Sequence, residues 1–217
     1  MAGEISQDQL CAVTIAPAGL DGVLGLPTAP QGVVLFAHGS GSSRFSPRNT
    51  LVAQALRASG FATLLFDLLT AEEAEERRNV FDIALLSERL RMATAWVRRA
   101  PETAGLAVGY FGASTGAAAA LVAAAVETIA AIVSRGGRPD LAGQTLARVR
   151  APTLLIVGGR DTAVLELNRA AFCALRCEKQ LTIIPGATHL FEEPGALEAV
   201  VDHARRWFLT HLPGAAR

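Results

Sequence analysis

Gly112-Ala113-Ser114-Thr115-Gly116 follows the apolar run 105–111 and precedes the alanine-rich stretch 117–126. A strand, a sharp turn and a helix in that order form the context in which G-x-S-x-G builds a nucleophile elbow. Glycines are needed there because the serine adopts a strained backbone conformation, and side chains at either glycine would collide with the neighbouring strand and helix. The helix that begins after the serine directs its N-terminal amides at the reaction centre. This stretch therefore predicts a nucleophilic serine.

Around this stretch, apolar runs alternate with helical patterns, which is typical of a mainly parallel sheet with helices on both faces. We expect strands at 32–37, 62–66, 106–111, 130–133, 153–157 and 180–184, an N-terminal antiparallel hairpin at 12–15 and 22–26, and helices at about 46–60, 80–97 and from 194 onward. A lid domain could be inserted between residues 133 and 153, but this segment has room for only about one short helix, 140–148. The sequence predicts one α/β domain, 1–217, with no large cap.

Composition limits the partners and the cell compartment. The 20 basic side chains balance the 20 acidic ones, which argues against a nucleic-acid partner. No apolar run approaches the roughly 18 to 20 residues of a membrane helix, and the first residues lack the layout of a secretion signal. Three cysteines form an odd, sparse set that suits free thiols in a reducing compartment. We expect a cytoplasmic protein without a membrane partner; an exposed edge strand would permit a homodimer.

A serine nucleophile needs a general base, and His189 is the best candidate. In folds of this type the order along the chain is Ser, then Asp or Glu, then His. His189 follows the strand expected at 180–184, at the carboxyl edge of the sheet where ligands bind. His203 and His211 fall in the last helix, whereas His38 precedes the serine and is expected to brace its turn.

The acid that orients the base is predicted to be Asp161. It follows the strand expected at 153–157 through a glycine-bearing turn, which delivers its carboxylate to the same sheet edge. Glu166 is a rival that should lie one turn deeper in the next helix, and Asp67 is a rival that breaks the usual order. The acid would hold the imidazole tautomer and stabilise the imidazolium.

An oxyanion hole is predicted from the small-residue turn at 36–42, Phe-Ala-His-Gly-Ser-Gly-Ser. The backbone amide of Ser40 or Gly41, together with that of Thr115, would donate to the oxyanion. Loss of one such donor typically costs about 3 to 4 kcal/mol of barrier. No H-x-H, HExxH or carboxylate cluster is present, so neither a metal nor another cofactor is expected.

Four motifs extend these observations to a family: 35–49 (LFAHGSGSSRFSPRN), 111–116 (FGASTG), 134–140 (SRGGRPD) and 186–191 (GATHLF). They resemble the dienelactone-hydrolase-like branch of the α/β-hydrolase superfamily, some members of which are fused to phosphoribosyltransferase domains. The resemblance implies an α/β-hydrolase fold and a triad of Ser114, Asp161 and His189. Dienelactone hydrolases carry cysteine at the nucleophile, whereas position 114 is serine, so the resemblance implies esterase-like hydrolysis without the lactone substrate.

The substrate pocket is expected to be open and to involve Arg44, Phe45, Arg135 and Phe191. Either arginine could attract a substrate carboxylate. Alternatively, each could pair with a local acid such as Glu192 or Glu193.

We expect a serine hydrolase that cleaves a small carboxylic ester, lactone or thioester through an acyl-enzyme. One alternative directs the same triad to peptides or acyl-peptides. Another is a non-catalytic binding protein that retains the fold.

Overall fold

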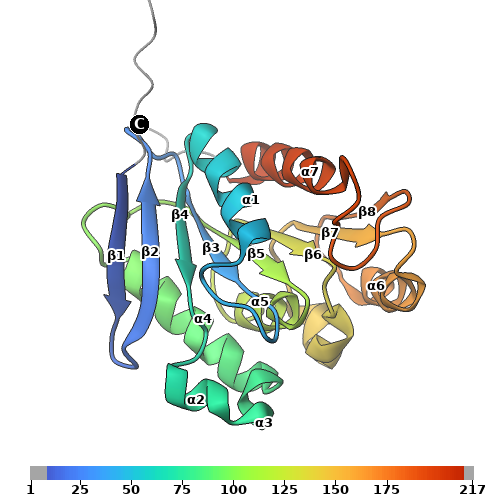
Figure 1. Ribbon diagram of the computed structural model, residues 1–217, viewed down its shortest axis with the longest axis horizontal. Coiled ribbons are helices and arrows are strands. Elements are labelled where there is room, and N and C mark those ends of the chain that lie inside the picture. Colours follow the sequence, from blue (N-terminus) through green and yellow to red (C-terminus); the bar gives the residue numbers. More distant parts are fainter. Residues whose placement is uncertain (1–8, 213–217) are drawn as a thin grey trace, which may run out of the picture.

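The computed structural model describes residues 9–212, so both ends of the predicted domain lie outside the described residues. Within that range the strands form one eight-stranded sheet in the order β1-β2-β4-β3-β5-β6-β7-β8 (Figure 1). The strands are β1 (Gln9–Ile15), β2 (Leu20–Leu26), β3 (Val33–Ala37), β4 (Ala62–Phe66), β5 (Val108–Ala113), β6 (Ala131–Arg135), β7 (Thr153–Gly158) and β8 (Lys179–Ile184). The pairs β1–β2 and β2–β4 are antiparallel and the remaining pairs are parallel, which confirms the predicted fold class.

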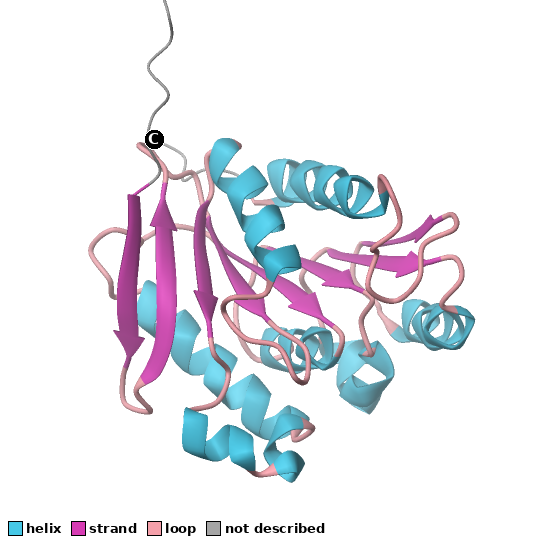
Figure 2. Cartoon of the chain, viewed as in Figure 1, coloured by secondary structure: helices cyan, strands magenta, loops and turns pink. Residues whose placement is uncertain are grey.

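Helices cover both faces of this sheet (Figure 2). They are α1 (Pro47–Ala58), α2 (Ala71–Glu75), α3 (Arg77–Val80), α4 (Ile83–Val97), α5 (Thr115–Ala124), α6 (Thr162–Ala174) and α7 (Ala196–His211), with a 3₁₀ segment, η1, at Pro139–Arg148. Helices α1 and α7 pack on one face with Phe36 and Phe111, whereas α4 and α5 pack on the other with Leu35 and Tyr110. Neighbouring strand residues thus enter opposite core layers, as the two-residue repeat of a strand requires.

The predicted helix at 80–97 is in fact divided. Val80 ends α3, and α4 begins only at Ile83, because the Asp82 carboxylate caps it by accepting from the Leu85 amide at 3.0 Å. The short helix expected at 140–148 is a 3₁₀ segment broken at Gly143, whose φ is +52°. None of the helices between residues 9 and 212 has the length and apolar character needed to cross a membrane.

Two strands, β5 and β6, also run two residues further than predicted towards the sheet's carboxyl edge. Pairing of β5 with β6 continues as far as Ala113 opposite Arg135, which places the end of β5 directly before Ser114. Parallel strands point their carboxyl ends to one edge, so the loops after β3 to β8 meet there. That edge carries the candidate site.

Candidate active site

Ser114 lies in a tight turn between β5 and α5, with φ 50° and ψ −122°. A non-glycine residue in this region costs about 1 to 3 kcal/mol, which surrounding contacts must offset. Two such contacts come from the end of β6 and the loop after it: the Ser114 amide donates to the Arg135 carbonyl at 3.3 Å, and the Arg138 amide donates to the Ser114 carbonyl at 3.1 Å. Although Ser114 is the N-cap of α5, its side chain makes no capping hydrogen bond. Its hydroxyl is therefore left for chemistry.

The glycines of the motif are required by close packing. A Cβ atom built on Gly112 would lie 2.5 Å from the Ala117 Cα atom, inside α5. One built on Gly116 would lie 2.1 Å from the Ala37 carbonyl oxygen, at the end of β3. Any side chain at these positions would push the helix away from the sheet, so the elbow depends on both glycines.

Asp161 and His189 meet at the ends of β7 and β8. The His189 Nδ1 atom lies 2.7 Å from the Asp161 Oδ2 atom, and the two side chains are 38% and 16% exposed. Asp161 is the N-cap of α6 but makes no side-chain capping bond. Its carboxylate is thus available to orient the imidazole and to stabilise an imidazolium.

The loop that carries His189 is fixed by its backbone. Both carboxylate oxygens of Glu193 accept from the Thr188 amide at 3.1 Å. Hydrogen bonding to Thr188, first through its side chain and then through its backbone, lowers the pKa of this carboxyl. The Arg160 amide donates to the Ala187 carbonyl at 2.9 Å, which joins the Asp161 turn to the same loop. A Cβ atom on Gly158 would lie 2.4 Å from that carbonyl oxygen. Asp161 and His189 are therefore positioned as one unit.

Ser114 and His189 both lie against the end of β6 and the residue that follows it. The Ser114 amide bonds to Arg135, and a Cβ atom built on the next residue, Gly136, would lie 3.5 Å from the His189 Cε1 atom. Among residues 9–212, no hydrogen bond joins the Ser114 hydroxyl to the imidazole. Contacts of this kind are often long in unliganded enzymes and tighten when substrate binds.

Of the two rival acids, neither contacts His189. The Glu166 carboxylate pairs with Arg169 at the surface of α6. Asp67, which follows β4, accepts from the Arg44 amide at 2.7 Å and pairs with the Arg44 guanidinium. The structure thus brings Asp161, and not its rivals, to His189.

The predicted oxyanion amides meet beside the serine, but one of them is occupied. The Ser40 amide donates to the Thr115 Oγ1 atom at 3.0 Å, so it can bind an oxyanion only after that hydroxyl turns away. Thr115 is the first residue of α5, and the first amides of an α-helix have no acceptor within the helix. Gly41, the other predicted donor, has a left-handed φ of +70°.

His38 holds the oxyanion turn in place. Its Nδ1 atom lies 3.0 Å from the Gly39 carbonyl, and its Nε2 atom accepts from the Leu68 amide at 3.1 Å. Burial is the main cause that lowers the pKa of this imidazole. A neutral ring with its proton on Nδ1 satisfies both bonds, as expected of a structural histidine.

The four predicted pocket residues lie in different environments. Arg44 lines a cavity but pairs with Asp67 and, at 3.3 Å, with Asp21. Phe45 is 66% exposed and its ring lies against the Arg44 guanidinium. Phe191, the remaining aromatic residue predicted for the pocket, is buried in the core with α7 and has a left-handed φ of +56°.

Arg135 differs from Arg44 in its burial and in its partners. It is buried, and its guanidinium donates to the Asn49 Oδ1 atom at 3.4 Å. Its Nε atom has no hydrogen-bond partner among residues 9–212. Burial and the charge of Arg48 lower its pKa to about 10, so it remains a cation at neutral pH. The local acids expected to neutralise it are engaged elsewhere: Glu192 pairs with Arg48, and Glu193 binds Thr188.

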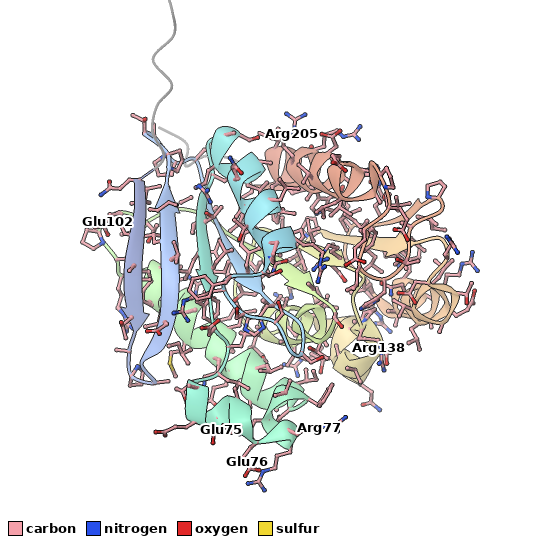
Figure 3. The ribbon with its side chains drawn as sticks, viewed as in Figure 1. Glu75, Glu76, Arg77, Glu102, Arg138 and Arg205 are labelled. Atoms are coloured by element: carbon pink, nitrogen blue, oxygen red, sulfur yellow. The ribbon has the colours of Figure 1, made fainter. Side chains whose placement is uncertain are left out.

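A cavity of about 340 Å³ opens beside the oxyanion turn, between it and the unit formed by α2 and α3. No element with defined bounds was predicted from the sequence between the strand at 62–66 and the helix at 80–97, so this wall of the cavity was not foreseen. Glu73 fixes the unit: it forms a capping box with Thr70, pairs with Arg89 of α4 and accepts from Asn79 through its carbonyl. The charged residues Glu75, Glu76 and Arg77 lie at its outer end, away from the sheet (Figure 3). The unit therefore has a polar exterior over a cavity.

Comparison with known proteins is consistent with this geometry. A model of the dienelactone hydrolase family matches residues 20–208, which include the elbow, the Asp161 turn and the His189 loop. The chain belongs to the dienelactone hydrolase family. In the part of the chain that the structure describes, no group of three or more His, Cys, Asp or Glu residues could hold a metal ion.

Two relatives are similar over most of this family member. A crystal structure of a dienelactone hydrolase from Anabaena variabilis is 55% identical, with a TM-score of 0.90, and the match covers 95% of this chain and 98% of that one. A Mycobacterium tuberculosis protein, provisionally named a phosphoribosyl transferase, is 59% identical over 210 residues. That match covers 96% of this chain but 47% of the relative, so the chain spans about half the length of the curated relatives that it matches.

More distant structures share the fold alone. XC6422 from Xanthomonas campestris, described as a serine hydrolase without a lid, is 22% identical with a TM-score of 0.75, and the match covers 97% of this chain and 98% of that one.

Proposed function

We propose that the protein is a serine hydrolase that cleaves a small carboxylic ester, lactone or thioester. The observation that carries this proposal is the 2.7 Å hydrogen bond between His189 and Asp161 at the sheet edge where the strained Ser114 lies. Family membership and the named hydrolase from Anabaena variabilis support it.

In this mechanism the Ser114 hydroxyl attacks the substrate carbonyl while the His189 Nε2 atom takes its proton. Asp161 stabilises the imidazolium through Nδ1. The Thr115 amide and an amide of the turn at Ser40 and Gly41 would receive the oxyanion, where the N-terminus of α5 favours negative charge. The imidazolium then protonates the leaving group, and water releases the acyl group from the serine by the reverse sequence.

Labelling with a fluorophosphonate and hydrolysis of 4-nitrophenyl acetate test this assignment. We expect Ser114→Ala to abolish labelling and to reduce turnover to the background rate. Ser59→Ala is the matched control, because this hydroxyl caps the far end of α1 by donating to the Ala55 carbonyl. Unchanged labelling and turnover in Ser114→Ala would overturn the proposal.

A further inference from the structure

We propose that the 340 Å³ cavity receives the acyl part of the substrate and selects uncharged aliphatic acyl groups over those that end in a carboxylate. This inference rests on the proposed function, and three features of the structure carry it: the position of the cavity relative to His189, its lining, and its charge.

The position of the cavity assigns it to the acyl group. Because the imidazolium must protonate the leaving group, that group has to face His189, which follows β8 on one side of Ser114. The cavity lies on the other side, towards β3 and β4, and Gly39, Ser40 and Thr115 line its inner end. A carbonyl bound at the oxyanion amides therefore extends its acyl chain into the cavity and its leaving group away from it.

The lining of the cavity suits a hydrocarbon chain. Its inner wall is apolar and comes from the segment after β4 and from α2, α3 and α4, with Leu68, Leu69, Ala71, Ala74, Val80 and Leu86. His38 also lines it but has both ring nitrogens engaged, with Gly39 and Leu68. At roughly 30 Å³ for each non-hydrogen atom, by analogy with water in the liquid, 340 Å³ holds about eleven such atoms.

The charged groups of the cavity oppose an anion. Arg44 is the cation of the lining, and both carboxylates that pair with it, Asp21 and Asp67, line the same cavity. One positive and two negative charges leave a formal charge of −1. A substrate carboxylate would have to displace one of these partners, so Arg44 is not available as its counter-ion. Any preference for anions would have to come from elsewhere in the site.

A series of 4-nitrophenyl esters tests the proposal, because the shared leaving group keeps the His189 side constant. We expect kcat/KM to rise from acetate through butyrate to hexanoate, by up to about fourfold for each methylene that is buried. The half-ester 4-nitrophenyl hydrogen glutarate, which adds a carboxylate to a chain of similar length, should react at least about tenfold more slowly than the hexanoate. Asp67→Asn should reduce this discrimination several-fold, because it removes one negative charge from the cavity.

Two variants of α2 locate the effect. Ala74→Trp fills the cavity and should reduce kcat/KM for the hexanoate by about tenfold or more while leaving the acetate within about twofold. Glu75→Trp is the matched control: it adds the same ring to the same helix at a residue outside the lining, and it should leave both substrates unchanged.

The outcomes separate this inference from the proposed function. Absence of both labelling and ester hydrolysis would overturn the proposed function. Acetate turnover that depends on Ser114, combined with a flat chain-length profile or with a preference for the glutarate half-ester, would overturn the acyl assignment alone. An unchanged profile in Ala74→Trp would also overturn it.

Discussion

The two sides of Ser114 are held by different kinds of contact. On the β3 side, backbone packs directly against backbone, since a Cβ atom on Gly116 would meet the Ala37 carbonyl oxygen at 2.1 Å. On the β7–β8 side, the functional contact is one hydrogen bond between the partly exposed side chains of Asp161 and His189. The first side can barely adjust, whereas rotation of one ring adjusts the second. The backbone around Ser114 and the Thr115 amide is thus held rigidly, whereas the Ser40 amide is still bound to the Thr115 hydroxyl. In the proposed mechanism, the contact between Ser114 and His189 is left to form with substrate.

Breaking the packed side should have the largest effect. Gly116→Ala places a methyl group inside the contact between α5 and β3, and no flexible side chain can yield there. We expect loss of soluble folded protein or, in any protein that folds, loss of ester hydrolysis to the background level. Circular dichroism, thermal unfolding and 4-nitrophenyl acetate turnover measure both effects.

Gly159→Ala controls for the loss of glycine as such. A Cβ atom built on Gly159 would lie 3.3 Å from its nearest neighbour, the Ile184 carbonyl oxygen. We therefore expect this variant to fold and to keep an activity close to that of the unmodified chain. A Gly116→Ala protein with full activity would show that the elbow tolerates displacement, and the contrast between the two sides would disappear.

Breaking the adjustable side should spare the fold and remove most of the chemistry. Asp161→Asn keeps a hydrogen-bond partner for His189 but favours the wrong imidazole tautomer and leaves the imidazolium without its carboxylate. We expect kcat to fall by roughly 10³- to 10⁴-fold, as in comparable triads, with little change in the melting temperature. Glu166→Gln on the next helix is the control and should be silent. Equal losses in both variants would show that the acid has been misassigned.

The sequence was sufficient for features that depend on local backbone geometry. The elbow could be predicted because the glycines at 112 and 116 and the apolar run before them are adjacent to the serine. The positions of Asp161 and His189 followed from strand ends, since parallel strands deliver their loops to one edge. Even the division between α3 and α4 had a local signal in Asp82, a good N-cap residue that the apolar stripe concealed.

The remainder depended on contacts between distant segments. Both arginines at the site looked equivalent in sequence, but Asp21 and Asp67 reach Arg44 from β2 and from the end of β4, whereas Arg135 is buried beside Asn49. The bond from the Ser40 amide to the Thr115 hydroxyl is likewise set by tertiary packing over 75 residues of chain. Such pairings have no sequence period, so the charge of the pocket could not be predicted.

The smallest expected effect is a decrease in the free energy of unfolding when His38, on the packed side, is protonated. Burial lowers the pKa of His38, so the unfolded chain takes up a proton first as the pH falls. The stability contributed by the neutral ring is therefore complete above about pH 6.5, the ordinary value, and decreases below it, by no more than about 1.4 kcal/mol per pH unit. Protonation of Nε2 would also remove the acceptor for the Leu68 amide.

Urea unfolding at pH 7.5 and 5.5 should show a smaller pH dependence of the free energy of unfolding in His38→Gln than in the unmodified chain. His203→Gln tests whether the other histidine with a lowered pKa accounts for the effect. Parallel pH profiles for His38→Gln and the unmodified chain would mean that His38 does not couple protonation to the oxyanion turn.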